Sequence, residues 1–126
     1  MKILVTDDIK GWCDYHIAVL NSIFDDIEVT EANSATEAYN KVLENNKNPF
    51  DVIITDLQME SDYEPLYAGE WLVERIKELK NYYKTKIVII SATYNIKMIA
   101  EKYGVDCIPK TTARNFPDAY KAILLQ

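Results

Sequence analysis

Apolar residues in this chain gather in five short runs, and each run is followed by a longer stretch with apolar residues at helical spacing. The short runs predict strands at residues 2–6, 27–32, 51–55, 86–90 and 105–108. The stretches that follow them predict helices at residues 11–24, 34–46, 69–80, 94–103 and 115–125. Strands that alternate with helices indicate a parallel sheet covered on both faces, with right-handed crossovers. We therefore expect a doubly wound α/β fold with five strands and five helices.

Local signals set the ends of two of these helices. Ser34 and Glu37 have the spacing of a capping box, which predicts that the second helix begins here. Gly104 follows the helix at 94–103, and glycine readily adopts the left-handed conformation that ends a helix. Both elements should therefore have well-defined termini.

The composition is typical of a folded domain. The chain has 126 residues, of which 48% are hydrophobic and 27% are charged, and no linker, repeat or low-complexity segment divides it. We expect a single domain over residues 1–126, with no output domain visible. The longest apolar run is far shorter than a membrane span, and Asp7 and Asp8 near the N-terminus argue against a signal peptide. No membrane insertion is expected.

Charge and cysteine usage narrow the possible partners and location. The net charge of −6 argues against direct binding to nucleic acid, which requires a basic face. Cys13 and Cys107 match neither a metal-ligand spacing nor a disulfide framework. Free thiols are typical of a reducing compartment, so the predicted location is the cytoplasm.

Polar residues follow four of the predicted strands where each strand ends. The first strand runs into Asp7 and Asp8, the third into Asp56, the fourth into Ser91 and the fifth into Lys110. The carboxyl ends of parallel strands lie along one edge of a sheet, where open α/β sheets bind their ligands. Three converging carboxylates repel one another unless a hard cation such as Mg²⁺ balances them. The pattern indicates metal-assisted phosphoryl chemistry.

In this order and spacing, the motifs resemble those of the receiver domain of two-component response regulators, and the match spans essentially the whole chain. It includes the acidic pair Asp7-Asp8, then Asp56 with Met59 three residues later, then Ser91, and finally Lys110 after the last strand. The resemblance implies a flavodoxin-like sheet with strand order 2-1-3-4-5, as in the chemotaxis receiver.

The resemblance also implies a role for each acidic position. Asp56 would be the phosphoacceptor, taking a phosphoryl group from the phosphohistidine of a sensor histidine kinase or phosphotransfer protein. Asp8 and Asp56 would bind Mg²⁺ directly together with the backbone carbonyl of Gln58, while Asp7 would act through a coordinated water. Such a domain is not a turnover enzyme: it is a phosphoacceptor switch that assists its own phosphorylation and dephosphorylation.

The remaining family positions concern the switch and its output. Lys110 would pair with the phosphoryl group, and Ser91 would move to donate a hydrogen bond to it. A downstream protein would then bind the face formed by the helix at 94–103, the strand at 105–108 and the last helix. Ser91 could instead be only a helix N-cap, and Asp7-Asp8 only a solvated loop pair.

Two features depart from the family pattern. Receivers usually carry an aromatic residue three positions before the lysine, where this chain has Cys107, and Tyr94 is a candidate replacement. The loop at 57–68 is longer than usual, and in the family a glycine lies closer behind the phosphoacceptor. This loop is either a tolerated surface insertion or an element that screens the pocket or selects the kinase.

Other functions remain open at this stage. A receiver-like binding module with lost switching is one, because Cys107 cannot act as the usual moving ring. A haloacid dehalogenase-type phosphohydrolase is another, but such enzymes need an acid two residues after the nucleophile, where this chain has Gln58. The single histidine, His16, is expected at the surface or partly buried on the first helix and is not expected to be phosphorylated.

Overall fold

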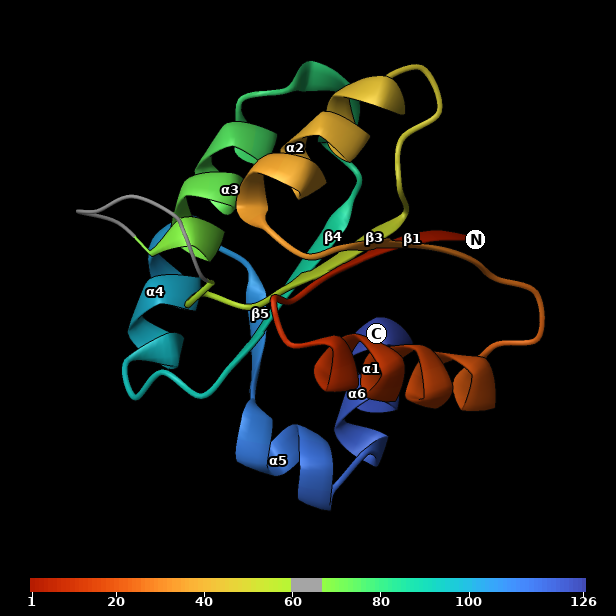
Figure 1. The fold of residues 1–126 in the computed structure, drawn as a ribbon, viewed down its shortest axis with the longest axis vertical. Helices are drawn as coiled ribbons and strands as arrows, with labels where there is room; N and C mark the ends of the chain where they lie inside the picture. The colour runs from red at the N-terminus through yellow and green to blue at the C-terminus, as the bar shows by residue number, and fades with distance from the viewer. Residues whose placement is uncertain (60–66) are drawn as a thin grey trace.

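The computed structural model describes residues 1–59 and 67–126. Its five strands form one parallel sheet in the order β2-β1-β3-β4-β5 (Figure 1). The strands are β1 Lys2–Thr6, β2 Glu28–Ala32, β3 Val52–Thr55, β4 Lys86–Ser91 and β5 Asp106–Pro109. The predicted flavodoxin-like doubly wound sheet and its strand order are thus confirmed.

Six α-helices and one short 3-10 helix occur in the described part of the chain. They are α1 Lys10–Ile23, α2 Ala35–Glu44, α3 Ala68–Lys77, η1 Lys80–Tyr82, α4 Ile96–Tyr103, α5 Lys110–Asn115 and α6 Asp118–Leu124. Both predicted helix ends are confirmed. Ser34 Oγ accepts a hydrogen bond from the amide of Glu37 at 3.1 Å, and Gly104 ends α4 with a φ of 67°.

The expectation of five helices was wrong at the C-terminal end. Instead of one helix at 115–125, the chain forms α5, which was not predicted and ends at Asn115 with Phe116 as its C-cap, and then α6, which begins at Asp118. Phe116 has φ −136° and ψ 73°, outside the helical region. It precedes Pro117, whose ring disfavours helical conformation in the preceding residue. The proline therefore separates two helices.

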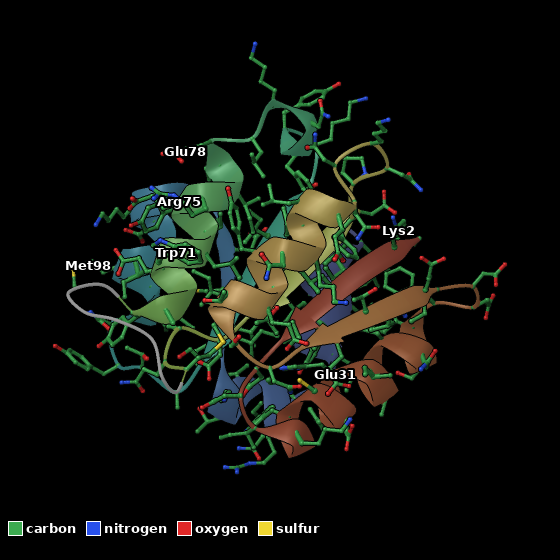
Figure 2. All side chains as sticks on the ribbon, turned by 45° about the horizontal axis from the view of Figure 1, so that its top comes forward. Lys2, Glu31, Trp71, Arg75, Glu78 and Met98 are labelled. Atoms are coloured by element: carbon green, nitrogen blue, oxygen red, sulfur yellow. The ribbon has the colours of Figure 1, made fainter. Side chains whose placement is uncertain are left out.

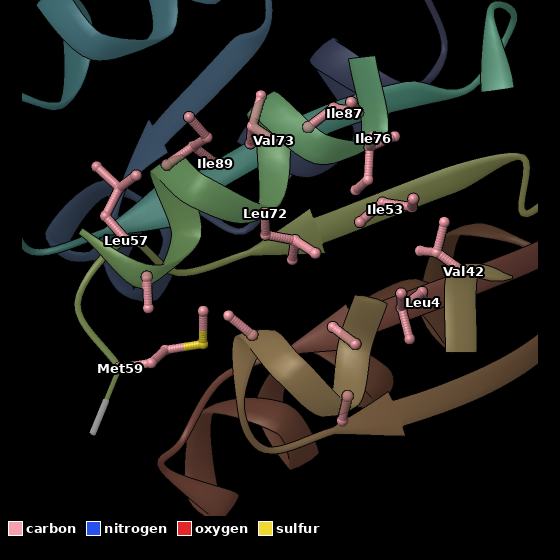
Figure 3. Close-up of a cluster of buried hydrophobic side chains, with 14 of the residues drawn as sticks. Leu4, Val42, Ile53, Leu57, Met59, Leu72, Val73, Ile76, Ile87 and Ile89 are labelled. Carbon is pink, nitrogen blue, oxygen red and sulfur yellow. The ribbon is translucent and has the colours of Figure 1, made fainter. Parts of the chain in front are cut away.

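Helices cover both faces of the sheet (Figure 1), and an apolar core lies under each layer of helices. Helices α2, α3 and α4 cover one face with a mainly aliphatic cluster, which includes Leu4, Ile53 and Leu72 (Figure 3). Helices α1, α5 and α6 cover the other face, where aromatic residues such as Trp12, Tyr15 and Tyr120 join the aliphatic ones. None of the helices in residues 1–59 and 67–126 is long and apolar enough to cross a lipid bilayer.

Candidate functional site

Strand register brings the polar strand ends to one edge of the sheet. Thr6 of β1 pairs with Ala32 of β2 on one side and with Thr55 of β3 on the other. The backbone pairing continues past the strands, because the amide of Asp7 donates to Ala32 O at 3.2 Å and that of Asp56 donates to Thr6 O at 3.1 Å. Asp7 and Asp56 are therefore held side by side by main-chain hydrogen bonds.

Three carboxylates form an acidic cluster at this edge. Carboxylate oxygens of Asp7, Asp8 and Asp56 lie within 4.8 Å of one another. Asp7 is fully buried, Asp56 is 5% exposed and Asp8 is half-buried. The pKa of Asp7 is raised, mainly by burial and further by the charge of Asp56. The amide of Ile9, which donates to Asp7 Oδ1 at 2.9 Å, acts in the opposite direction but does not outweigh burial. Closely spaced all-oxygen donors of this kind fit a hard divalent cation such as Mg²⁺.

Lys110 supplies the positive charge inside the cluster. Its Nζ lies 2.9 Å from Asp7 Oδ2 and 3.0 Å from Asp56 Oδ2, and only 8% of the residue is exposed. Burial acts to lower the pKa of Lys110, but the hydrogen bond with Asp7 and the charge of Asp56 outweigh it, so the pKa is raised. Lys110 is the first residue of α5 and directly follows β5, so its backbone is held at the same edge of the sheet as the carboxylates.

Apolar side chains anchor the segment that follows Asp56. Leu57 is fully buried and Met59 is 8% exposed, and both point into the aliphatic core (Figure 3). Gln58 between them is exposed, so its side chain points outward and only its backbone carbonyl remains a candidate metal ligand. The amide of Leu57 donates to Asp56 Oδ1 at 2.7 Å, which fixes the orientation of the carboxylate.

Gly69 packs directly against the backbone of Asp56. Its amide donates to Leu57 O at 2.9 Å, and a Cβ added to it would lie 1.8 Å from Asp56 O. No other residue fits here without displacing the backbone of Asp56. Gly69 is thirteen positions after Asp56 in the sequence, yet its backbone packs directly on that of Asp56. The predicted loop at 57–68 includes residues 60–66, which lie outside the described part of the chain.

Ser91 is placed at the same edge but is engaged elsewhere. It ends β4, is 1% exposed, and its Oγ lies 3.0 Å from Thr93 Oγ1 and accepts a hydrogen bond from the amide of Thr93 at 3.2 Å. The N-cap of α4 is Asn95, so the alternative that Ser91 merely caps this helix is wrong. A hydroxyl bound to a neighbouring hydroxyl is free to exchange that partner for another acceptor.

The β4–α4 side of the site is open. A surface pocket of about 540 Å³ is lined by residues 91–98 and 109–111. Tyr94 is 94% exposed and Met98 is 64% exposed, so neither ring nor thioether fills the pocket in this conformation. Cys107 is half-buried against the aliphatic core, and burial raises the pKa of its thiol. The position that usually carries a large ring therefore holds a small uncharged group.

The sequence analysis missed three residues beside the site. His16 was expected at the surface or partly buried, but it is 1% exposed, and its Nδ1 lies 2.7 Å from the hydroxyl of Tyr120. Trp12, assigned only to a helix, places its ring 4.9 Å from Lys110 Nζ. Gly69 was read only as a helix start. Their spacing in the chain carries no signal for these contacts, because all three depend on elements brought together from distant parts of the sequence.

Comparisons with known proteins agree with this geometry. The family model described as "Response regulator receiver domain" matches residues 3–115. No match was found among curated proteins.

Solved structures give the same result. A response regulator receiver domain protein from Clostridium thermocellum is 28% identical, with a TM-score of 0.69, over 86% of this chain and 81% of that chain. The signal receiver domain of a DNA-binding response regulator from Colwellia psychrerythraea 34H is 20% identical, with a TM-score of 0.76, over 100% of this chain and 99% of that chain. The chemotaxis response regulator CheY4 of Vibrio cholerae is 23% identical, with a TM-score of 0.68, over 84% and 82% of the two chains. The last two show the shared fold alone.

Proposed function

The chain belongs to the response regulator receiver domain family, and from this premise we propose that it accepts a phosphoryl group on Asp56 in a Mg²⁺-dependent reaction. The donor is the phosphohistidine of a sensor histidine kinase or phosphotransfer protein. One observation carries the proposal: the buried carboxylate of Asp56 lies in a cluster with Asp7 and Asp8 while Lys110 Nζ is 3.0 Å from its Oδ2. A nucleophile, candidate cation ligands and a fixed ammonium are the groups that phosphoryl transfer requires.

In the proposed reaction an oxygen of Asp56 forms a bond to phosphorus as the bond from phosphorus to the donor imidazole nitrogen breaks. The electron pair of that bond stays on the imidazole. The Leu57 amide holds the Asp56 carboxylate at 2.7 Å, so the nucleophile is oriented before the donor arrives. A Mg²⁺ ion held by Asp8, Asp56 and the Gln58 carbonyl, with Asp7 acting through a water, would neutralise charge on the phosphoryl oxygens.

Lys110 and Ser91 act after transfer in this proposal. When Asp56 becomes an acyl phosphate, the Lys110 ammonium pairs with the phosphoryl oxygens in place of the Asp56 carboxylate. Ser91 then exchanges Thr93 for a phosphoryl oxygen. Ser91 and Lys110 both border the open pocket beside α4. The exchange of their partners would therefore change the conformation of the face formed by α4, β5 and the last helix. We propose this face as the binding surface for a downstream protein.

The proposed setting is the cytoplasm, with no direct contact to nucleic acid. The free thiols of Cys13 and Cys107 suit a reducing compartment, and the net charge of −6 disfavours binding to phosphate backbones.

Intact-protein mass after incubation with Mg²⁺ and acetyl phosphate tests the proposal. We expect one labile phosphoryl group on the parent chain, none after chelation of Mg²⁺ and none on Asp56→Asn. Asp14→Asn is the matched control, because Asp14 is exposed on α1 and its carboxylate forms an ion pair with the exposed Lys10 at 2.9 Å. Phosphoryl uptake by Asp56→Asn at the parent rate would refute the assignment. Release of many phosphates per chain would instead favour a phosphohydrolase.

Cys107 supports one second candidate, a receiver-like binding module with altered or lost switching. A small thiol at this position cannot exchange with solvent as a large ring does. Amide chemical shifts of α4 and β5 with and without beryllofluoride and Mg²⁺ separate the two. Shifts confined to the acidic cluster would favour the module, and shifts that extend through α4 would favour the switch.

A further inference from the structure

Lys110 has a third partner besides the two carboxylates. Its Nζ lies 4.9 Å from the centroid of the Trp12 ring, within the range of a cation–π contact. Indole is the aromatic group that attracts an ammonium most strongly, and the contact gains strength where water is excluded. Because Lys110 is only 8% exposed, the ammonium is held between two anionic oxygens and one aromatic face.

The Trp12 ring is itself fixed by neighbouring aromatic rings. Tyr15 meets it edge-on with ring centroids 5.5 Å apart, and His16 lies 5.6 Å away. The hydroxyl of Tyr120, on α6, lies 2.7 Å from His16 Nδ1. Helix α1 therefore presents a supported indole to Lys110.

The same group of rings also holds the backbone of the helix that carries Lys110. The hydroxyl of Tyr15 donates to Ala113 O at 2.8 Å and approaches Arg114 O at 3.2 Å. Both carbonyls belong to α5, whose first residue is Lys110. Helix α1 thus fixes both ends of the lysine: the helix from which it extends and the ammonium at its tip.

His16 adds no competing charge to this arrangement. Burial and the nearby charge of Lys110 lower the pKa of His16 to about 3, so its ring is neutral at physiological pH. A protonated imidazole beside Trp12 would compete for the aromatic group and repel the lysine. The neutral ring instead acts as packing for the indole.

We propose that Trp12 is a positioning residue for phosphoryl transfer, whose indole face holds the Lys110 ammonium at the place where phosphoryl oxygens arrive. This inference rests on the proposed function of Asp56. Once Asp56 is phosphorylated, its carboxylate no longer carries the charge that attracts Lys110. The indole, like the carboxylate of Asp7, keeps its attraction for the ammonium throughout, so Trp12 and Asp7 are the two partners that phosphorylation of Asp56 leaves unchanged.

Fluorinated tryptophan tests this without changing the shape of the core, because added fluorine atoms weaken the negative face of the ring. Trp71→Phe provides the background, so that Trp12 is the one labelled tryptophan. Trp71 lies on α3 (Figure 2) against Tyr39, and it packs on the opposite face of the sheet from Trp12. We expect the rate of phosphoryl uptake from acetyl phosphate to fall with each fluorine, by about tenfold in total. A rate that does not depend on fluorine number would overturn the proposal.

Two substitutions give a second measure. Trp12→Leu should slow uptake about tenfold, Trp12→Phe should restore most of the rate, and Trp71→Leu should leave it unchanged. If Trp12→Leu does not fold, the fluorine series still decides. Equal rates for the Leu and Phe variants at position 12 would contradict a role for the aromatic face.

A readout without phosphorylation separates failure of this inference from failure of the proposed function. The ε-methylene protons of Lys110 should resonate upfield in the parent, because the Nζ bonded to that methylene lies over the Trp12 ring, and they should lose that shift in Trp12→Leu. An unchanged shift would show that Trp12 does not hold the lysine. Absence of phosphoryl uptake by the parent would overturn the proposed function, and the methylene shift would then still decide whether the contact exists.

Discussion

The two faces of the sheet support the acidic cluster in different ways. On the α2-α3-α4 face the contacts are aliphatic and steric, and Gly69 of α3 packs against the backbone of Asp56 with no room for a Cβ. On the α1-α5-α6 face the contacts are aromatic and electrostatic, since Trp12 lies under the Lys110 ammonium and His16 pairs with Tyr120. One face fixes where the backbone of Asp56 lies, and the other fixes where the positive charge of Lys110 lies. Substitutions on the two faces should therefore fail in different ways.

The largest effect is expected on the steric face. Gly69→Ala should lower the free energy of unfolding by about 3 kcal/mol, the upper end for overpacking, because the added methyl meets backbone that cannot rotate away. Phosphoryl uptake should fall as Asp56 is displaced. Urea denaturation and intact mass measure the two effects.

Gly11→Ala is the matched control for that substitution. Gly11 is exposed on α1, and nothing lies within 4 Å of an added Cβ. It should fold with unchanged or slightly raised stability, because alanine has the higher helix propensity. Equal stability of Gly69→Ala and Gly11→Ala would show that the close contact between Gly69 and Asp56 does not exclude a side chain.

The stability of the chain should depend on pH through His16, which lies on the aromatic face. The pKa of His16 is lowered to about 3 in the folded chain but is about 6.5 when unfolded, so below pH 6.5 the unfolded chain binds the extra proton. Stability should therefore fall as pH drops, by about 2 kcal/mol between pH 7 and pH 5. Thermal unfolding at a series of pH values measures this. His16 is the only histidine, so His16→Phe should flatten the curve in this window; a parent curve already flat there would contradict the assignment.

Two buried tyrosines, one on each face, give a matched pair. Tyr120→Phe leaves His16 Nδ1 buried with no hydroxyl beside it and should cost about 2 kcal/mol. Tyr82→Phe removes a hydrogen bond donated to Val42 O at 2.7 Å and should cost about 1 kcal/mol. Denaturation midpoints compare them. A larger loss of stability for Tyr82→Phe than for Tyr120→Phe would contradict the prediction that the tyrosine hydrogen bond on the aromatic face contributes more.

The smallest effect is expected on the open β4–α4 side. Tyr94 is 94% exposed, so Tyr94→Ala should change the free energy of unfolding by less than about 0.5 kcal/mol. Tyr83→Ala serves as the control, because Tyr83 is 78% exposed and precedes β4, whereas Tyr94 follows it. A loss above about 1 kcal/mol for Tyr94→Ala alone would mean that the ring packs into the pocket.

Prediction from sequence succeeded where a short-range pattern carries the information. Alternating strand and helix patterns predicted the sheet, and the capping box at Ser34 and the glycine at 104 predicted helix ends. It failed directly after β5, where no helix was predicted but α5 forms at Lys110–Asn115, separated from α6 by Phe116 and Pro117. The positions of Asp7, Asp8, Asp56 and Lys110 at strand ends predicted that they would meet, because parallel strands share one carboxyl edge.

The sequence by itself determined the element order, the family and the residues that gather at the sheet edge, since these follow from hydrophobic periodicity and from motifs read within each strand. Only the tertiary structure decided that Gly69 closes on Asp56, that His16 is buried against Tyr120 and that Trp12 lies beside Lys110. These contacts join residues 13 to 104 positions apart. Their geometry depends on how helices from separate crossovers pack on the sheet, which no local pattern of the chain specifies.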